Sequence, residues 1–168
     1  SGLEPLAEPP SPARITDGLM RAVVQRVRHA AVEVAGRVVA DIGAGGLVLL
    51  GIDRADTVTE AEWLARKIGR LRMFDDAEGR MNLDIRAAGG QWLVVSQFTL
   101  LADCLGGHRP SFIAAAPPEV AEPLYLRFVE ALRAEGADVR TGVFRAQMQV
   151  HLTNDGPVTL VVDTPPRH

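Results

Sequence analysis

Short runs of β-branched and aliphatic residues fill residues 22–51 of this chain. The runs cover 22–27, 31–34, 37–42 and 46–51, and small turns rich in glycine separate the last three. Such runs bounded by glycine are typical of β-strands. Because connections this short join antiparallel strands, we expect these runs to pair as antiparallel neighbours.

Two later segments carry apolar residues at helical spacing. The first opens with a capping box from Thr57 to Glu60. Its apolar residues follow about one turn apart, at Ala61, Leu64, Ile68 and Leu71. The second has its apolar positions within 124–132 and should end at Gly136, with Pro123 in its first turn. Both patterns predict amphipathic helices.

The remaining apolar runs complete a β-rich pattern. Residues 92–96 read as a buried strand that ends in the polar pair Ser96-Gln97. Three closing strands are expected, at 138–141, 147–153 and 158–163. The segment Asn154-Asp-Gly-Pro157 reads as a turn between the last two. The pattern as a whole predicts an α+β fold, mostly antiparallel, with two to three helices in one domain over 20–165.

Composition narrows the class of protein. The chain has 168 residues, 47% of them hydrophobic and 23% charged, as in a globular domain. A net charge of -3 argues against general electrostatic binding of nucleic acid. The single cysteine, Cys104, excludes an internal disulfide and is consistent with a cytoplasmic protein. Residues 1–19 contain four prolines and no signal-peptide pattern, so we expect a mobile leader that is either native or a cloning remnant.

The sequence lacks the common patterns of metal-binding and nucleophilic residues. The four histidines stand at no metal-binding spacing, so neither a metal nor another cofactor is expected. Cys104 has no basic neighbour in sequence until His108, and we expect it to be buried or inert. His151 alternates with apolar residues, which predicts a solvent-facing position. No apolar run is long enough to cross a membrane.

Two segments stand out instead. Ser96-Gln-Phe-Thr-Leu100 follows a buried strand, where polar residues often face a pocket. Asn154-Asp-Gly-Pro-Val-Thr159 places glycine before proline, which leaves backbone carbonyls uncovered for contact with a ligand. Taken alone, the second segment is better explained as an ordinary β-turn, because Gly-Pro is common in turns.

Together the two segments resemble the signature pair of D-aminoacyl-tRNA deacylases. The resemblance runs from Met20 to about Asp163. It includes the segments Arg21-Ala-Val-Val-Gln-Arg-Val27, Arg80-Met-Asn-Leu83, Arg109-Pro-Ser-Phe112, Ala115-Ala-Pro-Pro118, Glu122-Pro-Leu-Tyr125 and Thr141-Gly-Val-Phe144. It implies a barrel-like fold and a cytoplasmic proofreading hydrolase that cleaves D-amino acids, or glycine mischarged on alanine tRNA, from the 3' end of tRNA.

The resemblance also implies a homodimer. In such proteins the Gly-Pro bond is cis, and the motif of one subunit enters the pocket of the other. Gly156 and Pro157 would then reject L-amino acids by collision with rigid backbone. Arg26, Asn154 and Thr159 would support this segment.

The same resemblance suggests roles in the pocket. The Phe98 amide would stabilise the oxyanion, while Ser96 and Gln97 would line and orient the site. Thr99 is a nucleophile by chemistry, but no base stands beside it in sequence, so a positioning role is favoured. The terminal adenine would be held by Phe144 and Met148, for which core packing is the alternative.

Some positions depart from the family pattern. The loop 103–109 keeps only Arg109 and His108 where relatives commonly carry several basic residues, which suggests weaker or more salt-sensitive tRNA binding. Arg145 and Gln147 replace a small and an acidic residue near the adenine pocket. The alternative functions are a non-catalytic dimer that binds a tRNA end or adenosine, and a DNA-binding replication protein, for which no basic extension is present.

Overall fold

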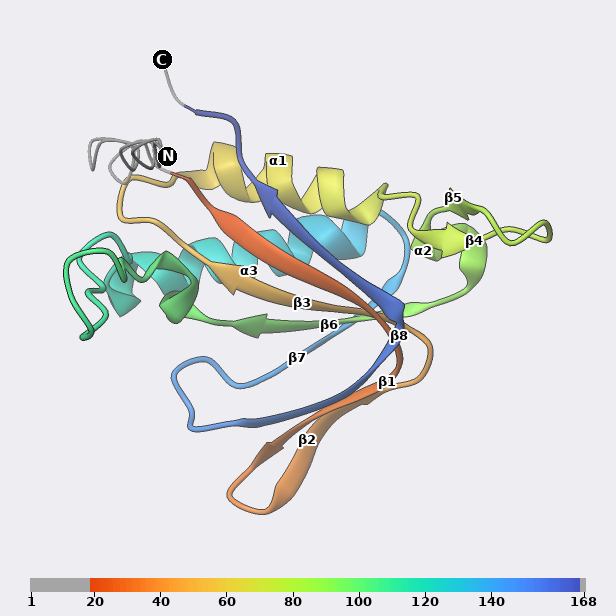
Figure 1. Ribbon diagram of the computed structural model, residues 1–168, viewed down its shortest axis with the longest axis horizontal. Helices are drawn as coiled ribbons and strands as arrows, with labels where there is room; N and C mark the ends of the chain where they lie inside the picture. Colours follow the sequence, from red (N-terminus) through yellow and green to blue (C-terminus); the bar gives the residue numbers. More distant parts are fainter. Residues whose placement is uncertain (1–18, 167–168) are drawn as a thin grey trace, which may run out of the picture.

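The computed structural model describes residues 19–166, in which one curved mixed sheet carries three α-helices and a short 3-10 helix (Figure 1). The predicted leader, 1–19, lies outside the described residues except for Leu19. The main sheet has the order β2-β1-β3-β6-β7, and β8 pairs with β1. Its strands are β1 (Arg21–Val34), β2 (Arg37–Ile42), β3 (Gly45–Gly51), β6 (Gln91–Ser96), β7 (Asp138–Thr141) and β8 (Gln149–Asp163).

The long strand β1 organises the sheet. It pairs antiparallel with β3 over its first half, with β2 over its second half and with β8 along most of its length. The runs predicted as separate strands, 22–27 and 31–34, are therefore two halves of one strand. β3 is parallel to β6, and β6 is parallel to β7. The sheet curls into the barrel-like form that the family resemblance implied, and the α+β prediction is confirmed, with antiparallel pairs around β1 and parallel pairs beyond β3 (Figure 1).

The predicted turn at 154–157 is wrong. These residues belong to β8, which continues through them while its pairing with β1 shifts register. Asn-Asp-Gly-Pro is a strong local turn signal, but the segments on both sides pair with the same strand. The tertiary pairing therefore overrides the local signal and turns the expected reversal into a bulge.

Helices α1 (Val58–Gly69) and α3 (Pro118–Ala134) cover one face of the sheet (Figure 1). The predicted capping box of α1 is present, since the Thr57 N–H donates to the Glu60 carboxylate at 2.7 Å and the Thr57 side chain caps the third residue. α3 starts at Pro118, so Pro123 lies in the second turn and not in the first. Burial of Ala121 against the core stabilises the additional turn. The smaller elements are β4 (Phe74–Asp75), β5 (Met81–Leu83), α2 (Ile85–Ala88) and the 3-10 helix η2 (Phe98–Leu101).

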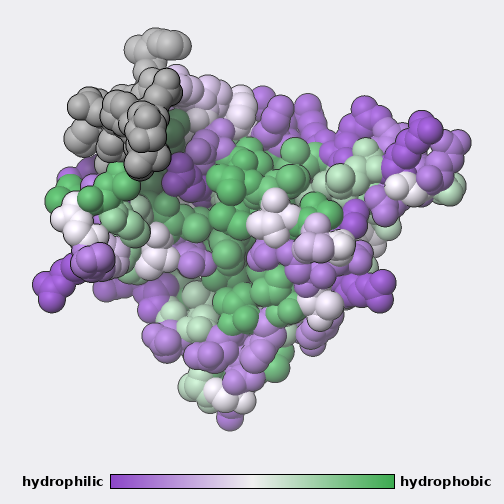
Figure 2. Space-filling model, viewed as in Figure 1, coloured by the Kyte–Doolittle hydropathy of each residue, from purple (hydrophilic) through white to green (hydrophobic). Residues whose placement is uncertain are grey.

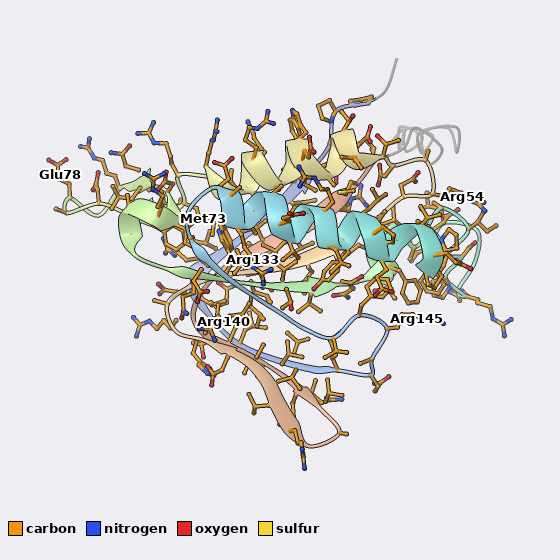
Figure 3. All side chains as sticks on the ribbon, turned by 180° about the vertical axis from the view of Figure 1, so that it is seen from behind. Arg54, Met73, Glu78, Arg133, Arg140 and Arg145 are labelled. Carbon is orange, nitrogen blue, oxygen red and sulfur yellow. The ribbon has the colours of Figure 1, made fainter. Side chains whose placement is uncertain are left out.

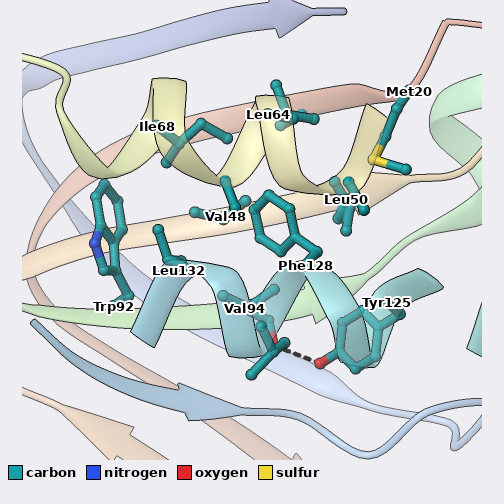
Figure 4. Packing of buried hydrophobic residues seen from close by; sticks show 14 of the residues in the cluster. Met20, Val48, Leu50, Leu64, Ile68, Trp92, Val94, Tyr125, Phe128 and Leu132 are labelled. Carbon is teal, nitrogen blue, oxygen red and sulfur yellow. Dashed lines mark hydrogen bonds between the residues drawn. The ribbon is translucent and has the colours of Figure 1, made fainter. Parts of the chain in front are cut away.

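The core lies on both faces of the sheet. Between the helices and the sheet, side chains such as Leu64, Phe128 and Leu132 are completely buried (Figure 4). On the concave face, a second cluster includes Leu47, Leu93 and Ile42. Successive residues of β6 point alternately into the two clusters. Burial on both faces explains why residues 92–95 form an unbroken apolar run.

Candidate active site

Several of the predicted site residues lie at the corner where β6 ends and η2 begins. The Gln97 N–H donates to the Leu50 carbonyl at 2.8 Å, which ties the end of β6 to β3 before η2 begins. Gly51 allows η2 to pack this closely, because a Cβ at that position would lie 2.3 Å from Leu101 Cδ2. The chain therefore turns sharply after Ser96 and exposes the first turn of η2 on the surface.

The beginning of η2 offers a backbone donor. A 3-10 helix bonds each N–H to the carbonyl three residues earlier, so the N–H of its first residue, Phe98, has no partner within the helix. The Phe98 ring is 56% exposed and meets Phe112 edge to face, with 5.2 Å between the ring centroids. Nearby, the Gln97 amide donates to the Thr99 hydroxyl at 3.1 Å. Within residues 19–166, no carboxylate or imidazole stands within hydrogen-bonding distance of that hydroxyl.

A pocket of about 650 Å³ opens beside η2. Four of the predicted site residues line it: Ser96, Phe98, Phe144 and Met148. The others come from the residue after β3, the 112–118 segment, the first turn of α3 and the bend before β8, namely Ile52, Phe112, Ala115, Ala116, Pro118, Ala121, Arg145, Ala146 and Gln147. Gln97 and Thr99 are not among the lining residues. They hydrogen-bond to each other at the corner between β6 and η2. The pocket is apolar with few polar groups, which is typical of small-ligand sites.

The inner wall of the pocket is anchored to the core. Phe144 packs on Tyr125 with 5.7 Å between ring centroids. The Tyr125 hydroxyl donates to the Val94 carbonyl at 3.0 Å, and burial raises the pKa of Tyr125 to about 12. Met148 lies against Gly142, where an added Cβ would stand 2.8 Å from its sulfur. For Phe144 and Met148, core packing and pocket lining therefore both hold.

The Gly-Pro segment is a protruding bulge on β8. Gln25 pairs with Thr159 and Val27 with Asn154, so four residues of β8 stand opposite one of β1. The Asn154 side chain clamps the bulge, because it accepts from the Val158 N–H at 2.8 Å and donates to the Thr159 hydroxyl at 2.8 Å. The Gly156–Pro157 bond is cis, and Gly156 has a φ of 135°.

Arg26 connects the bulge to the neighbouring backbone by hydrogen bonds. Its Nε donates to the Asp155 carbonyl at 3.0 Å, and its Nη1 donates to the Met73 carbonyl at 3.0 Å. Nη1 also lies 3.3 Å from the Asp75 carboxylate. The Arg26 side chain is only 11% exposed, whereas Arg28, which meets Asp155 at 3.4 Å, is 77% exposed. Arg26 is therefore the buried brace and Arg28 a surface contact.

The two groups of predicted residues do not meet within one chain. None of Arg26, Asn154, Gly156, Pro157 and Thr159 lines the pocket. Figure 3 shows Met73, which Arg26 ties to the bulge, and Arg145, which lines the pocket, toward opposite ends of the molecule. Each group is assembled, but a single subunit keeps them apart.

Other sequence predictions had mixed outcomes. Cys104 is exposed and not buried, because the loop that carries it lies on the surface. His151 faces solvent as predicted, 3.8 Å from Glu33. Sequence reasoning did not place Ile52 or Phe112 at the pocket. No local pattern marks them, because the end of β3 with Ile52 after it, and the 112–118 loop, are brought to the corner by tertiary packing.

Residues 19–166 contain neither the side-chain cluster of a metal site nor a membrane-spanning helix. Among residues 19–166, no three histidine, cysteine or acidic side chains come together as a metal site. The described helices also lack the length and apolar character needed to cross a bilayer.

Comparison with known proteins gives consistent matches. The sequence pattern of the D-Tyr-tRNA(Tyr) deacylase family matches residues 23–163. D-aminoacyl-tRNA deacylase from Chlorobaculum parvum is 56% identical over 147 residues, covering 87% of this chain and 99% of that protein. The enzyme of the same name from Chloroflexus aurantiacus is 59% identical over 145 residues, with 86% and 91% covered.

Solved structures share the fold. One described as c-Myc DNA Unwinding Element Binding Protein is 44% identical, with a TM-score of 0.82 over 86% of this chain and 99% of that one. A probable eukaryotic D-amino acid tRNA deacylase has a TM-score of 0.75 at 18% identity, covering 87% and 100%. The family match over most of the chain and the identities above 50% show that this chain belongs to the D-Tyr-tRNA(Tyr) deacylase family, whose members are hydrolases of the ester bond in D-aminoacyl-tRNA.

Proposed function

We propose that this chain clears D-amino acids, and glycine mischarged on alanine tRNA, from the 3' end of tRNA by hydrolysis in the pocket beside η2. The observation that carries this proposal is that Ser96, Phe98, Phe144 and Met148 line one pocket in a member of a deacylase family. The terminal adenine lies against Phe144 and Met148, and the ester lies toward Ser96 and the Phe98 N–H.

The chemistry uses backbone and substrate groups. Water attacks the ester carbonyl, the negative charge forms on the carbonyl oxygen, and the Phe98 N–H donates to it. The bond to the ribose oxygen then breaks, and that oxygen takes a proton, which leaves the free amino acid and the tRNA hydroxyl. The neighbouring 2'-hydroxyl of the RNA assists proton transfer. Thr99 positions the corner, since its hydroxyl accepts from Gln97 and has no base beside it among residues 19–166.

The active assembly is a homodimer. Register places Val161, Val23 and Leu49 in a row across β8, β1 and β3, next to Val95 of β6, which is already buried. Val161 is 64% exposed, and Figure 2 shows apolar side chains gathered across the middle of this face. An apolar sheet face of this kind is suited to burial against a second copy. Such a contact allows the Gly156–Pro157 bulge of one subunit to enter the pocket of the other.

In this arrangement the bulge acts as a filter. The carbonyl groups of Gly156 and Pro157 face the substrate's chiral centre, where an L side chain collides with braced backbone. A D side chain points away, and glycine has only hydrogen there. The contacts of Arg26 and Asn154 keep the bulge from yielding to an L substrate.

The alternative is a dimer that binds a tRNA end or adenosine without turnover. A pocket with few polar groups suits that function as well, so turnover itself has to be measured. DNA binding is disfavoured for this chain by its net charge of -3, although a solved relative is described as a DNA-binding protein.

Release of labelled amino acid from matched D- and L-tyrosyl-tRNA tests the proposal. We expect rapid hydrolysis of the D ester alone, and the Thr99→Ala variant should retain it to within about threefold. Loss of activity in a folded Thr99→Ala protein would restore the covalent mechanism. Tight tRNA binding by the wild type without release of either amino acid would establish the binding module instead.

A further inference from the structure

Arg145 has an unusual place and conformation in the bend between β7 and β8. Its φ is 67°, in the left-handed region that side-chain-bearing residues rarely adopt. The neighbouring Ala146 N–H closes the bend by donating to the Val143 carbonyl at 3.2 Å. Glycine or asparagine would be easier at this position, so this chain carries an arginine where the backbone conformation disfavours it.

Among the described residues 19–166, Arg145 is also the only ionisable residue that lines the pocket. Within residues 19–166, no carboxylate or carbonyl forms a hydrogen bond or ion pair with its guanidinium, and the residue is exposed. This contrasts with Arg21, Arg127 and Arg140, which each hold a carboxylate at 3.0 Å or less. The part of the pocket lining that the structure describes therefore has an available cation and no acidic side chain to oppose it.

We propose that Arg145 binds the phosphate that joins the terminal adenosine to the rest of the tRNA. This inference rests on the proposed function, because it takes the adenine to lie against Phe144 and Met148. Arg145 follows Phe144 directly, so a base on that ring brings its own 5' phosphate close to the bend. The planar guanidinium matches a phosphate with two parallel hydrogen bonds.

The charge distribution of the chain supports a local contact. A net charge of -3 gives no general attraction for RNA, and the loop at 103–109 is poor in basic residues. A cation within the pocket supplies attraction only where the reacting end of the RNA enters. Arg145 thus helps to place the ester without holding the body of the tRNA.

Two substrates test this proposal: D-tyrosyl-tRNA, and the D-tyrosyl ester of adenosine, which lacks the phosphate. For Arg145→Gly, which removes the cation and suits the positive φ, we expect KM for the tRNA to rise about tenfold with kcat little changed. The loss should be confined to the substrate that carries the phosphate. The slope of log(kcat/KM) against log salt should fall by about 0.7, as for one lost contact on a single strand. Arg145→Lys should recover part of the loss.

Arg54→Ala is the matched control. Arg54 is exposed, lies on the same side of the molecule as Arg145 in Figure 3, and does not line the pocket. An equal KM increase for Arg54→Ala would show a diffuse electrostatic effect and overturn the phosphate site. An equal increase for the tRNA and the adenosine ester in Arg145→Gly would overturn it as well.

Calorimetry with adenosine and adenosine 5'-monophosphate tests the contact without turnover. We expect the wild type to bind the monophosphate more tightly and Arg145→Gly to lose that preference. Equal affinities of the wild type for both ligands would overturn the phosphate site while leaving the deacylase function standing. Failure of the wild type to hydrolyse either ester, with the monophosphate preference intact, would instead overturn the proposed function.

Discussion

The pocket beside η2 and the Gly156–Pro157 bulge are built in opposite ways. The pocket is a hollow of about 650 Å³ whose walls are mostly apolar side chains, several of which also pack against the core. The bulge is a protrusion whose shape is set by hydrogen bonds to backbone, from Arg26 to Asp155 and Met73 and between Asn154 and Val158. In the proposed function, the pocket selects by the surface of its side chains and the bulge by rigid main chain.

This difference indicates how one chain can use two separate regions to recognise two parts of a substrate. A hollow of side chains suits a constant ligand such as the terminal adenosine. A filter made of backbone, as proposed for the bulge, would read chirality without reading side-chain identity, because it offers no variable group to match. We therefore expect similar turnover for small, aromatic and acidic D-aminoacyl-tRNAs, and a preference of about a thousandfold for one of them would contradict the filter.

Filling the hollow should have the largest effect. Ala146 lines the pocket from the bend before β8, so Ala146→Trp places an indole where the adenosine is expected. Hydrolysis of D-tyrosyl-tRNA should fall by about a thousandfold or more, with the chain still folded by circular dichroism. Activity close to that of the wild type would show that the substrate binds elsewhere.

Changing the protrusion should affect selectivity. A Cβ at Gly156 would stand 2.8 Å from Val158 Cγ2 and 3.0 Å from the Val158 nitrogen, so Gly156→Ala must displace the bulge. We expect the ratio of D- to L-tyrosyl-tRNA hydrolysis to fall by about a hundredfold or more.

Gly36→Ala is the matched control for that variant. Gly36 also has a positive φ, 80°, but nothing lies within 4 Å of an added Cβ. This variant should lose about 1 kcal/mol of stability and keep its selectivity. An unchanged D to L ratio in Gly156→Ala would remove the bulge from the selection step.

Removing the brace should have a smaller effect. Arg26→Ala leaves the Met73 and Asp155 carbonyls without their donor, which should cost about 1–3 kcal/mol of unfolding free energy and loosen selectivity by about tenfold. Arg28→Ala removes a surface contact to the same Asp155 and should change stability by less than about 1 kcal/mol. Equal effects of the two variants, measured by urea unfolding and by the D to L ratio, would contradict the bracing role.

The smallest effect concerns the wall behind the hollow. Tyr125 is the only tyrosine of the chain, so tyrosinate absorbance reports it alone. Burial raises its pKa to about 12 from 10.0, so the folded protein favours the neutral phenol. The resulting stability is present below pH 10 and is lost as the pH rises through about 12. If Tyr125 of the folded protein titrated near pH 10, the pocket wall formed by Tyr125 and Phe144 would be open to water.

Local signals predicted the elements that local interactions stabilise. The start of α1 was predictable because Thr57 and Glu60 bond within one turn, and the residues of the two signature segments could be named. Long-range contacts decided the rest. β8 runs straight through a strong turn signal because β1 pairs with both halves, and Ile52 and Phe112 reach the pocket only through tertiary packing.

Mixed dimers test the central claim, that hollow and protrusion act together across two subunits. Gly156→Ala homodimers should hydrolyse both D- and L-tyrosyl-tRNA, and Ala146→Trp homodimers neither. When the two are mixed and allowed to exchange, each hybrid carries one intact pocket facing one intact bulge. We predict that excess Ala146→Trp subunits suppress hydrolysis of the L ester while hydrolysis of the D ester persists. An L activity that subunit exchange leaves unchanged, with hybrid dimers present by mass spectrometry, would contradict the account.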